Sequence, residues 1–340
     1  MTLQQFNTEQ RREHINTQQR FLGWDDARRR LNETRGSMGW KTVDGKDYLV
    51  RSYYDKQGIR RQRSLGPRST STENTQAEYE RGRDEAENRF KEIDAALARQ
   101  AAINRALGLG RVPIPAARAL RSLTDANLLG QGVRVVGTNA IYAYEAAAGV
   151  FVDSGITATG DIDLLFDSRH SINFVVSEEV AERSLIKVLR QFDSRYQRTA
   201  QQYRAQNAEG YLVDLIKPVR NPPWKKDISS IGTDGTDDLI AAEIEGLVWL
   251  ENAPAFESIV IDERGFPLRM ATPDPRAWTA HKLWLSRRDG REPIKKKRDA
   301  EQATTVAKLV AEHFPHLPYE ADELRMLPTK VFDAAASLFA

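Results

Sequence analysis

The sequence contains no cysteine, and this absence removes several kinds of chemistry at once. Disulfide scaffolds, thiol nucleophiles and thiolate zinc sites are all excluded. Histidine is scarce as well. The five histidines never fall at the H-x-x-x-H spacing of a zinc hydrolase, so that class of enzyme is not expected. If the chain is a catalyst, its chemistry must come from carboxylates, hydroxyls and cations.

Long apolar runs are also missing. No window reaches the roughly 18 apolar residues that a transmembrane helix needs, and the N-terminus lacks the apolar segment of a signal peptide. We therefore expect a cytoplasmic protein with no membrane partner. The chain has 340 residues, of which 40% are hydrophobic and 29% charged, and this length suits two or three domains.

The net charge of +2 conceals two basic segments. Residues 36–70 hold eight Lys or Arg against three Asp, and residues 280–300 hold eight Lys or Arg against three acidic residues. Local basic surface favours a polyanionic partner such as nucleic acid or a nucleotide phosphate. A solvated helix or sheet face has the same composition, so both interpretations stay open.

The first 130 residues are predicted to form helices around one small sheet. Residues 1–35 are expected to be helical, starting near 24–26, and residues 36–70 to form a basic three-stranded antiparallel meander with hairpin turns at 44–45 and 55–58. A helical region follows over 71–130, with Ser71 or Thr72 as the cap of its long helix. The aromatics of the meander either stack on nucleic acid or pack against the next helix.

From residue 131 the pattern becomes α+β. The expected core over 131–220 contains a strand at 133–137, a helix at 139–148, a strand at 159–166, a helix at 177–192 and a hairpin at 202–216 that turns at 209–210. A mixed α/β extension follows over 221–272, with a hairpin at 259–270. A helical domain over 273–340 begins at Asp274-Pro275, where Asp is a helix cap and Pro occupies the first helical position. Its next helix begins at Pro293.

Three aspartates stand out in the expected core. Asp161 and Asp163 are two residues apart on one strand, so their carboxylates point to the same face. Asp214 lies in an apolar strand, where an unpaired charge would be unfavourable. Magnesium is the natural counterion for such carboxylates, and three of them around two ions suit phosphoryl or nucleotidyl transfer. An exposed edge strand and an ordinary ion pair are the alternative explanations of these aspartates.

Gly137-Thr138 is predicted at a strand-to-helix turn. A glycine there lets phosphate approach the backbone, and the following helix presents N–H groups and a positive dipole. Each of these signals is weak alone, but their order is informative: strand, Gly-Thr turn, helix, paired acids, then a third acid on a later strand.

This order resembles the DNA polymerase beta nucleotidyltransferase superfamily, whose pattern is h-G-[GS], D-h-[DE] and a third acid. The amino-acid sequences of segments 137–145, 158–165 and 214–218 are similar to those of a little-characterised bacterial nucleotidyltransferase family. This resemblance runs from about Gly36 through the C-terminal helices. Two features depart from the pattern. Thr138 replaces the usual Ser or Gly, and a longer spacing implies an inserted loop at 148–158.

The resemblance implies a polymerase-beta-like core and a set of site residues. The implied metal ligands and catalytic residues, for two magnesium ions that manganese can replace, are Asp161, Asp163 and Asp214. The implied nucleotide-binding residues are Gly137, Thr138, Asn139, Lys282, Arg287 and Arg298. Asp299 is expected to be a structural partner of one of these cations.

The expected function is transfer of NMP from an NTP, ATP among the candidates, to an acceptor hydroxyl. RNA such as a tRNA 3′ end is the favoured acceptor, and similarity to abortive-infection toxins suggests a toxin-like role, with a regulatory protein as a possible partner. A protein or small-molecule hydroxyl remains an alternative acceptor. Rival functions are a nucleic-acid-binding or regulatory protein on the same scaffold, and a phosphohydrolase using the D-x-D pair.

Overall fold

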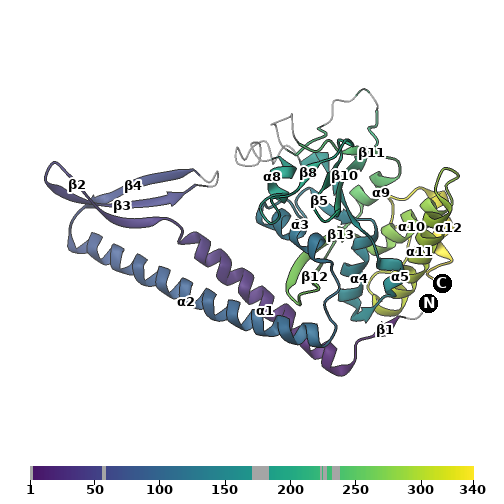
Figure 1. Cartoon of the computed structure of the whole chain (residues 1–340), viewed down its shortest axis with the longest axis horizontal. Coiled ribbons are helices and arrows are strands. Elements are labelled where there is room, and N and C mark those ends of the chain that lie inside the picture. Colours follow the sequence, from purple (N-terminus) through teal and green to yellow (C-terminus); the bar gives the residue numbers. More distant parts are fainter. Residues whose placement is uncertain (1–2, 56–58, 171–183, 223, 225–227, 232–237) are drawn as a thin grey trace.

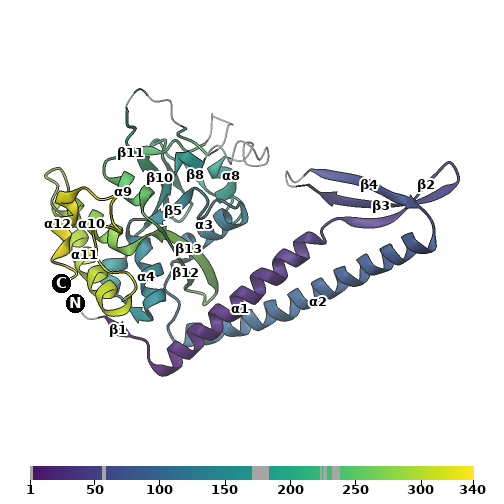
Figure 2. The same ribbon diagram turned by 180° about the vertical axis from the view of Figure 1, so that it is seen from behind.

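The computed structural model describes residues 3–55, 59–170, 184–222, 224, 228–231 and 238–340. These residues form a body built on a mixed sheet and an arm that projects from it (Figures 1 and 2). The predicted α+β class is confirmed. No described helix combines the length and the apolar character needed to cross a membrane.

The stem of the arm consists of helices α1 (Thr8–Glu33) and α2 (Thr70–Ala106), which pack side by side (Figure 1). Buried polar contacts join them: the hydroxyl of Thr17 donates to Asn104 over 2.9 Å, and the amide of Gln100 donates to Glu13 over 2.9 Å. A polar interface of this kind leaves little apolar periodicity in the sequence.

Two predictions about helix starts are wrong. The first helix does not start near 24–26, because Asn7 caps it and forms a capping box with Gln10. The cap of α2 is Ser69 rather than Ser71 or Thr72, and Thr72 is instead its capping-box partner.

The end of the arm is the three-stranded antiparallel meander predicted from the sequence. Strands β2 (Ser37–Val43), β3 (Lys46–Tyr54) and β4 (Arg60–Pro67) pair in that order; we call them the arm sheet. Leu49 is fully buried, and the guanidinium of Arg51 lies over the ring of Tyr79 on α2. In both views the β3–β4 end of the sheet points back toward the body (Figures 1 and 2).

The body contains a six-stranded mixed sheet. Its order is β5 (Val133–Val136), β7 (Asp161–Phe166), β10 (Leu212–Pro218), β9 (Arg204–Gln206) and β8 (Gln197–Arg198), with β11 (Ala242–Ile244) also pairing with β10. Strands β7 and β10 run parallel, whereas β5 and β9 are antiparallel to their neighbours. The predicted hairpin of β9 and β10 is confirmed.

Helices and a second hairpin surround this sheet. The elements are α3 (Ile114–Asp125), η1 (Thr138–Ala140), α4 (Ile141–Ala148), α8 (Leu185–Leu189), α9 (Leu247–Asn252), α10 (Pro275–Ser286), α11 (Pro293–His313), α12 (Thr329–Ala336) and the hairpin β12 (Ala255–Ile261) with β13 (Pro267–Pro273). As predicted, Asp274 caps α10 and Pro293 opens α11.

Two further expectations differ from the structure. The segment 148–158 is not a plain loop, because β6 (Val150–Phe151) pairs with β1 (Gln4–Gln5) and α5 (Ser154–Thr157) follows. The first part of the helix expected over 177–192 falls outside the described residues; within them, α8 is capped by Ser184 and ends before Phe192.

The turn between β12 and β13 rests on the stem of the arm. Gly265 has a φ of +87°, and a Cβ there would lie 2.0 Å from the main-chain oxygen of Ala101 on α2. Its own carbonyl accepts a hydrogen bond from Asn104 over 2.8 Å. Only glycine can therefore join the arm to the body at this point.

Gly265→Ala should lower the free energy of unfolding by about 2 kcal/mol or more, because it adds left-handed strain to a backbone clash. Urea unfolding measures the change. Gly23→Ala, where nothing lies within 4 Å of the added Cβ, is the control and should raise helix stability by up to about 1 kcal/mol. Equal behaviour of the two variants would contradict this account of the joint.

Candidate active site

The three aspartates singled out in the sequence converge in the structure. Each of Asp161, Asp163 and Asp214 offers a ligand oxygen, and these oxygens all lie within 4.8 Å of one another. The register of β7 and β10 places Asp163 directly beside Asp214. The alternating residues Ile162 and Val213 are fully buried on the other face of the sheet. The strand pairing therefore gathers the carboxylates on one face.

Gly137 packs against this cluster. Its φ is +65°, and a Cβ at this position would lie 2.0 Å from Oδ2 of Asp163. The carbonyl of Gly137 accepts a hydrogen bond of 3.1 Å from the indole of Trp278 on α10. The turn is thus held between the carboxylate and a C-terminal helix, and no residue larger than glycine fits.

The next two residues of the turn are buried and bonded within the protein. The hydroxyl of Thr138 accepts a hydrogen bond of 3.1 Å from the amide of Gln302 on α11, so its own proton stays available to a ligand. The amide of Asn139 donates to the main-chain oxygen of Asp161 over 2.7 Å. Asn139 therefore positions the start of β7.

Burial and like charges together shape the electrostatics of the cluster. Burial, and after it the charges of Asp161 and Asp214, raise the pKa of the Asp163 carboxyl to about 7, although the charge of Lys282 opposes the rise. An all-oxygen donor set with excess negative charge matches the preference of hard divalent cations such as magnesium. The three residues could therefore hold metal.

Arg204 is a residue that the sequence did not reveal. It lies opposite Asp214 on β9, and its Nε and Nη2 donate to the two carboxylate oxygens of Asp214 over 2.7 and 2.6 Å. These hydrogen bonds raise the pKa of Arg204, although burial opposes the rise. The guanidinium occupies both oxygens of the third acid and competes with any cation for them.

Lys282 lies buried on α10 near the cluster. Its Nζ is 2.9 Å from Oδ1 of the fully buried Asp299, and Arg291 reaches Oδ2 of the same carboxylate over 2.8 Å. Burial lowers the pKa of Lys282, while Asp299 and Asp163 raise it. Asp299 is thus the structural partner that the sequence suggested, and Arg291 is a second cation of the network that it did not.

The two arginines expected beside Lys282 lie differently. Arg287 is exposed at the C-terminal cap of α10. Arg298 is half-buried on α11, and its Nε has no hydrogen-bond partner within the part of the chain that the structure describes. Among the described residues, neither arginine forms a hydrogen bond or ion pair with the carboxylate cluster.

Comparison with known proteins agrees with this site. A family model described as nucleotidyltransferase matches residues 115–327, which is more than half of the chain. The chain belongs to this nucleotidyltransferase family and is a transferase enzyme. The match includes the cluster, the Gly-Thr turn and Lys282; it begins well after Gly36, so the arm lies outside it. Searches of curated proteins and of solved structures returned no match.

Arg204→Gln tests the competition for Asp214. Without metal, the variant should unfold at a lower denaturant concentration, because it loses two charge-assisted hydrogen bonds of a partly buried ion pair, a cost of about 2 kcal/mol. Magnesium should then bind more tightly than it does to the original protein, since the guanidinium no longer covers the carboxylate. Calorimetric titration and urea unfolding give the two values.

Arg198→Gln is the matched control, because this arginine of β8 donates to the main-chain oxygen of Asp238. It should leave magnesium affinity unchanged. Weaker magnesium binding by Arg204→Gln would mean that Arg204 orients Asp214 for the ion rather than competing with it.

Asp163 should make the metal-free protein less stable as pH rises. Its folded pKa of about 7 lies above its ordinary value of 3.8, so the folded state binds more protons between these pH values and stability falls from about pH 4 to pH 7. Asp163→Asn abolishes this ionisation. As pH rises from 4 to 8, its free energy of unfolding should come to exceed that of the original protein by about 2 to 4 kcal/mol. Urea unfolding with a chelator present measures the gain. Asp84→Asn, at an exposed position on α2, should follow the original protein across this range.

Proposed function

We propose that the protein transfers an NMP group from an NTP to an acceptor hydroxyl in a magnesium-dependent reaction, on a polymerase-beta-like core over residues 131–220. One observation carries the proposal: three carboxylate ligands lie within 4.8 Å of one another beside a turn that no residue larger than glycine could form. A phosphohydrolase would not need that turn, whereas a transferase must hold a triphosphate against its acids.

Asp161 and Asp163 would hold two magnesium ions and Asp214 one of them, with manganese as a substitute. Bound there, the ions would polarise the reacting phosphate and lower the pKa of the acceptor hydroxyl. In the balanced reaction, the acceptor oxygen forms a bond to the α-phosphorus, the α–β anhydride bond breaks, and pyrophosphate leaves.

The residues of the chain would divide the remaining work. Asp214 would accept the proton of the acceptor hydroxyl once Arg204 releases its carboxylate. Thr138 would donate its free hydroxyl proton to a terminal phosphate oxygen, with main-chain N–H groups of Gly137 and Asn139 beside it. Lys282 and Arg291 would neutralise charge on the triphosphate, and Arg287 and Arg298 would join them if the segment between α10 and α11 closes on the nucleotide.

The acceptor is proposed to be RNA, with a tRNA 3′ end as the first candidate and a toxin-like or defence role as its setting. The basic arm sheet supports a polyanionic acceptor over a protein or small-molecule hydroxyl. A regulatory protein that restrains the activity would accompany such a role.

The test is incubation with magnesium and each α-phosphate-labelled NTP, together with cellular RNA, cellular protein or a small hydroxyl compound. Label should appear in RNA. Asp161→Asn and Asp163→Asn should each reduce labelling by about 10³-fold or more, since the metal–carboxylate interactions that they remove are worth several kcal/mol. Asp84→Asn, an exposed acid on α2, should keep full activity.

Each outcome has a definite meaning. Label on protein or on the small compound would replace RNA as the acceptor. Full labelling by the Asp161 and Asp163 variants would refute the site, and no transfer from any NTP would refute the reaction.

A further inference from the structure

The arm sheet carries cations that the protein does not neutralise. Asp55 pairs with Arg61 over 2.8 Å, and Asp47 lies 3.6 Å from Arg68, so these two acids are already compensated. The exposed cations without an ion-pair partner among the described residues are Lys41, Lys46, Arg60 and Arg63. The sheet therefore presents unpaired positive charge to solvent, against one exposed acid at Asp44 in the β2–β3 turn.

Aromatic side chains occur at the same end of the sheet. Tyr53 and Tyr54 close β3 and are 37% and 48% exposed. The register sets Tyr53 opposite Arg61 and Tyr54 opposite Arg60 on β4. Each face of this hairpin end thus bears a tyrosine beside an arginine.

Neither tyrosine is buried in the core of the arm, although the guanidinium of Arg35 lies 5.5 Å from the ring centre of Tyr54. Packing between the sheet and its neighbours depends on other residues: Leu49 is fully buried, Arg51 lies 4.4 Å from the ring centre of Tyr79, and Arg68 lies 5.1 Å from that of Trp40. Trp40 is half-buried and its ring is covered by Arg68, whereas Tyr53 and Tyr54 are exposed. These two tyrosines therefore do not fit the suggestion that the meander aromatics pack against the next helix.

Protection of a sheet edge explains only part of the pattern. Lysine and arginine on an edge strand prevent pairing with other chains, and β4 is an edge strand. Exposed tyrosines add apolar surface and would oppose that purpose. Aromatic rings paired across the strands with cations instead match a surface that contacts phosphates and stacks bases.

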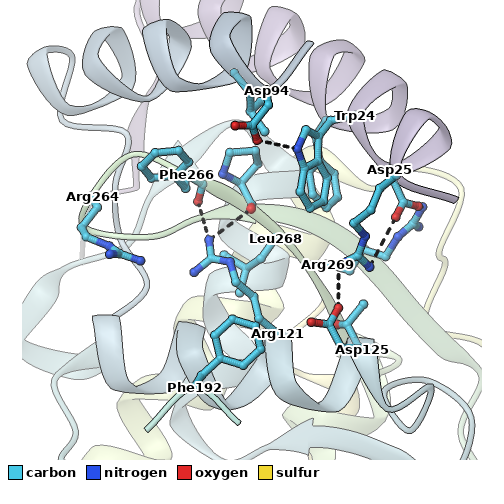
Figure 3. A pocket seen from close by; sticks show the side chains of 15 residues that line it. Trp24, Asp25, Asp94, Arg121, Asp125, Phe192, Arg264, Phe266, Leu268 and Arg269 are labelled. Atoms are coloured by element: carbon cyan, nitrogen blue, oxygen red, sulfur yellow. Dashed lines mark hydrogen bonds and ion pairs between the residues drawn. The ribbon is translucent and has the colours of Figure 1, made fainter. Parts of the chain in front are cut away.

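The arm is fastened to the body, so the direction of its end is defined. Arg269 of β13 donates to Asp25 on α1 over 2.9 Å (Figure 3). Arg28 of α1 donates to Asp125 on α3 over 2.6 Å. These pairs border a cavity of about 390 Å³ between stem and body. From this joint, the β3–β4 end of the arm sheet points back toward the body that holds the carboxylates (Figures 1 and 2).

We propose that the β3–β4 end of the arm sheet is the surface that holds an RNA acceptor during transfer, through its phosphates on Arg60 and Arg63 and through unpaired bases on Tyr53 and Tyr54. This inference rests on the proposed function, because the RNA held there is the acceptor whose hydroxyl reacts at the carboxylate cluster. Single-stranded RNA segments are the favoured ligand, since only unstacked bases can lie on tyrosine rings.

The experiment compares two double variants of the full-length protein, Arg60→Gln/Arg63→Gln and Tyr53→Ala/Tyr54→Ala. Fluorescence anisotropy with labelled polyuridylate and with unfractionated tRNA measures binding over a range of salt concentrations. Each double variant should bind polyuridylate roughly tenfold or more weakly. The arginine variant should also flatten the plot of log affinity against log salt, by about 0.7 for each RNA phosphate that the protein no longer neutralises.

Arg81→Gln/Arg105→Gln is the matched control, because it removes two exposed arginines from the stem helix α2. It should keep both the affinity and the salt slope. Magnesium and NTP should raise the thermal unfolding temperature of all three double variants equally, since none of these residues lies at the carboxylate cluster.

The results separate the two proposals. Unchanged RNA affinity in both arm variants, or an equal loss in the stem control, would overturn the arm surface while leaving transfer chemistry intact. Equal competition by double-stranded DNA or by polyglutamate would replace RNA with another polyanion. Loss of RNA binding by the arm variants in a protein that transfers no NMP would uphold the surface and refute the reaction.

Discussion

Parallel pairing of β7 with β10 sets Asp163 directly beside Asp214, and most of the site is a response to the repulsion that this pairing creates. Two carboxylates so close, with Asp161 on the same face, are unfavourable without positive charge nearby. The protein supplies Arg204 to Asp214 and places the buried Lys282 near Asp163. The pKa of Asp163 nevertheless stays raised, first by burial and then by the neighbouring acids. A divalent cation would relieve both effects.

The same constraint extends into the C-terminal helices. Gly137 lies against the carboxylate of Asp163, and its carbonyl accepts a hydrogen bond from the indole of Trp278 on α10. The amide of Gln302 on α11 donates to the hydroxyl of Thr138. These helices are therefore a wall of the site and not an appended module. A shift of α10 would move Lys282 and, through the hydrogen bond of Trp278, the Gly137 turn.

The sequence revealed those parts of the protein that depend on local patterns. Asp161 and Asp163 were predictable because alternation along a strand defines a face, and the start of α10 at Asp274 was predictable from its cap. The arm sheet followed from its turn residues. Asp214 was found because a charge in an apolar strand is unusual.

What escaped prediction depends on register and on partners distant in sequence. A two-residue turn at 209–210 would set Ala205 opposite Asp214, but the loop spans residues 207–211, so Arg204 takes that place. The start of α1 does carry a local signal, the capping box of Asn7 and Gln10, but no apolar stripe marks the helix that follows, because its contacts with α2 are polar. Arg291 could be identified only once Asp299 was seen to face both it and Lys282.

The chain enters and leaves the arm at neighbouring points. Before α1, strand β1 pairs with β6 of the body, and after α2 the chain continues into α3. At the base of the stem, Gln10 near the start of α1 donates to the main-chain oxygen of Leu107 at the end of α2 over 2.9 Å. Because the two ends of the arm are adjacent, the arm can be lengthened, exchanged or lost in evolution without a change in the fold of the body. The same catalytic body could in this way acquire different acceptors by exchange of the arm at these two attachment points.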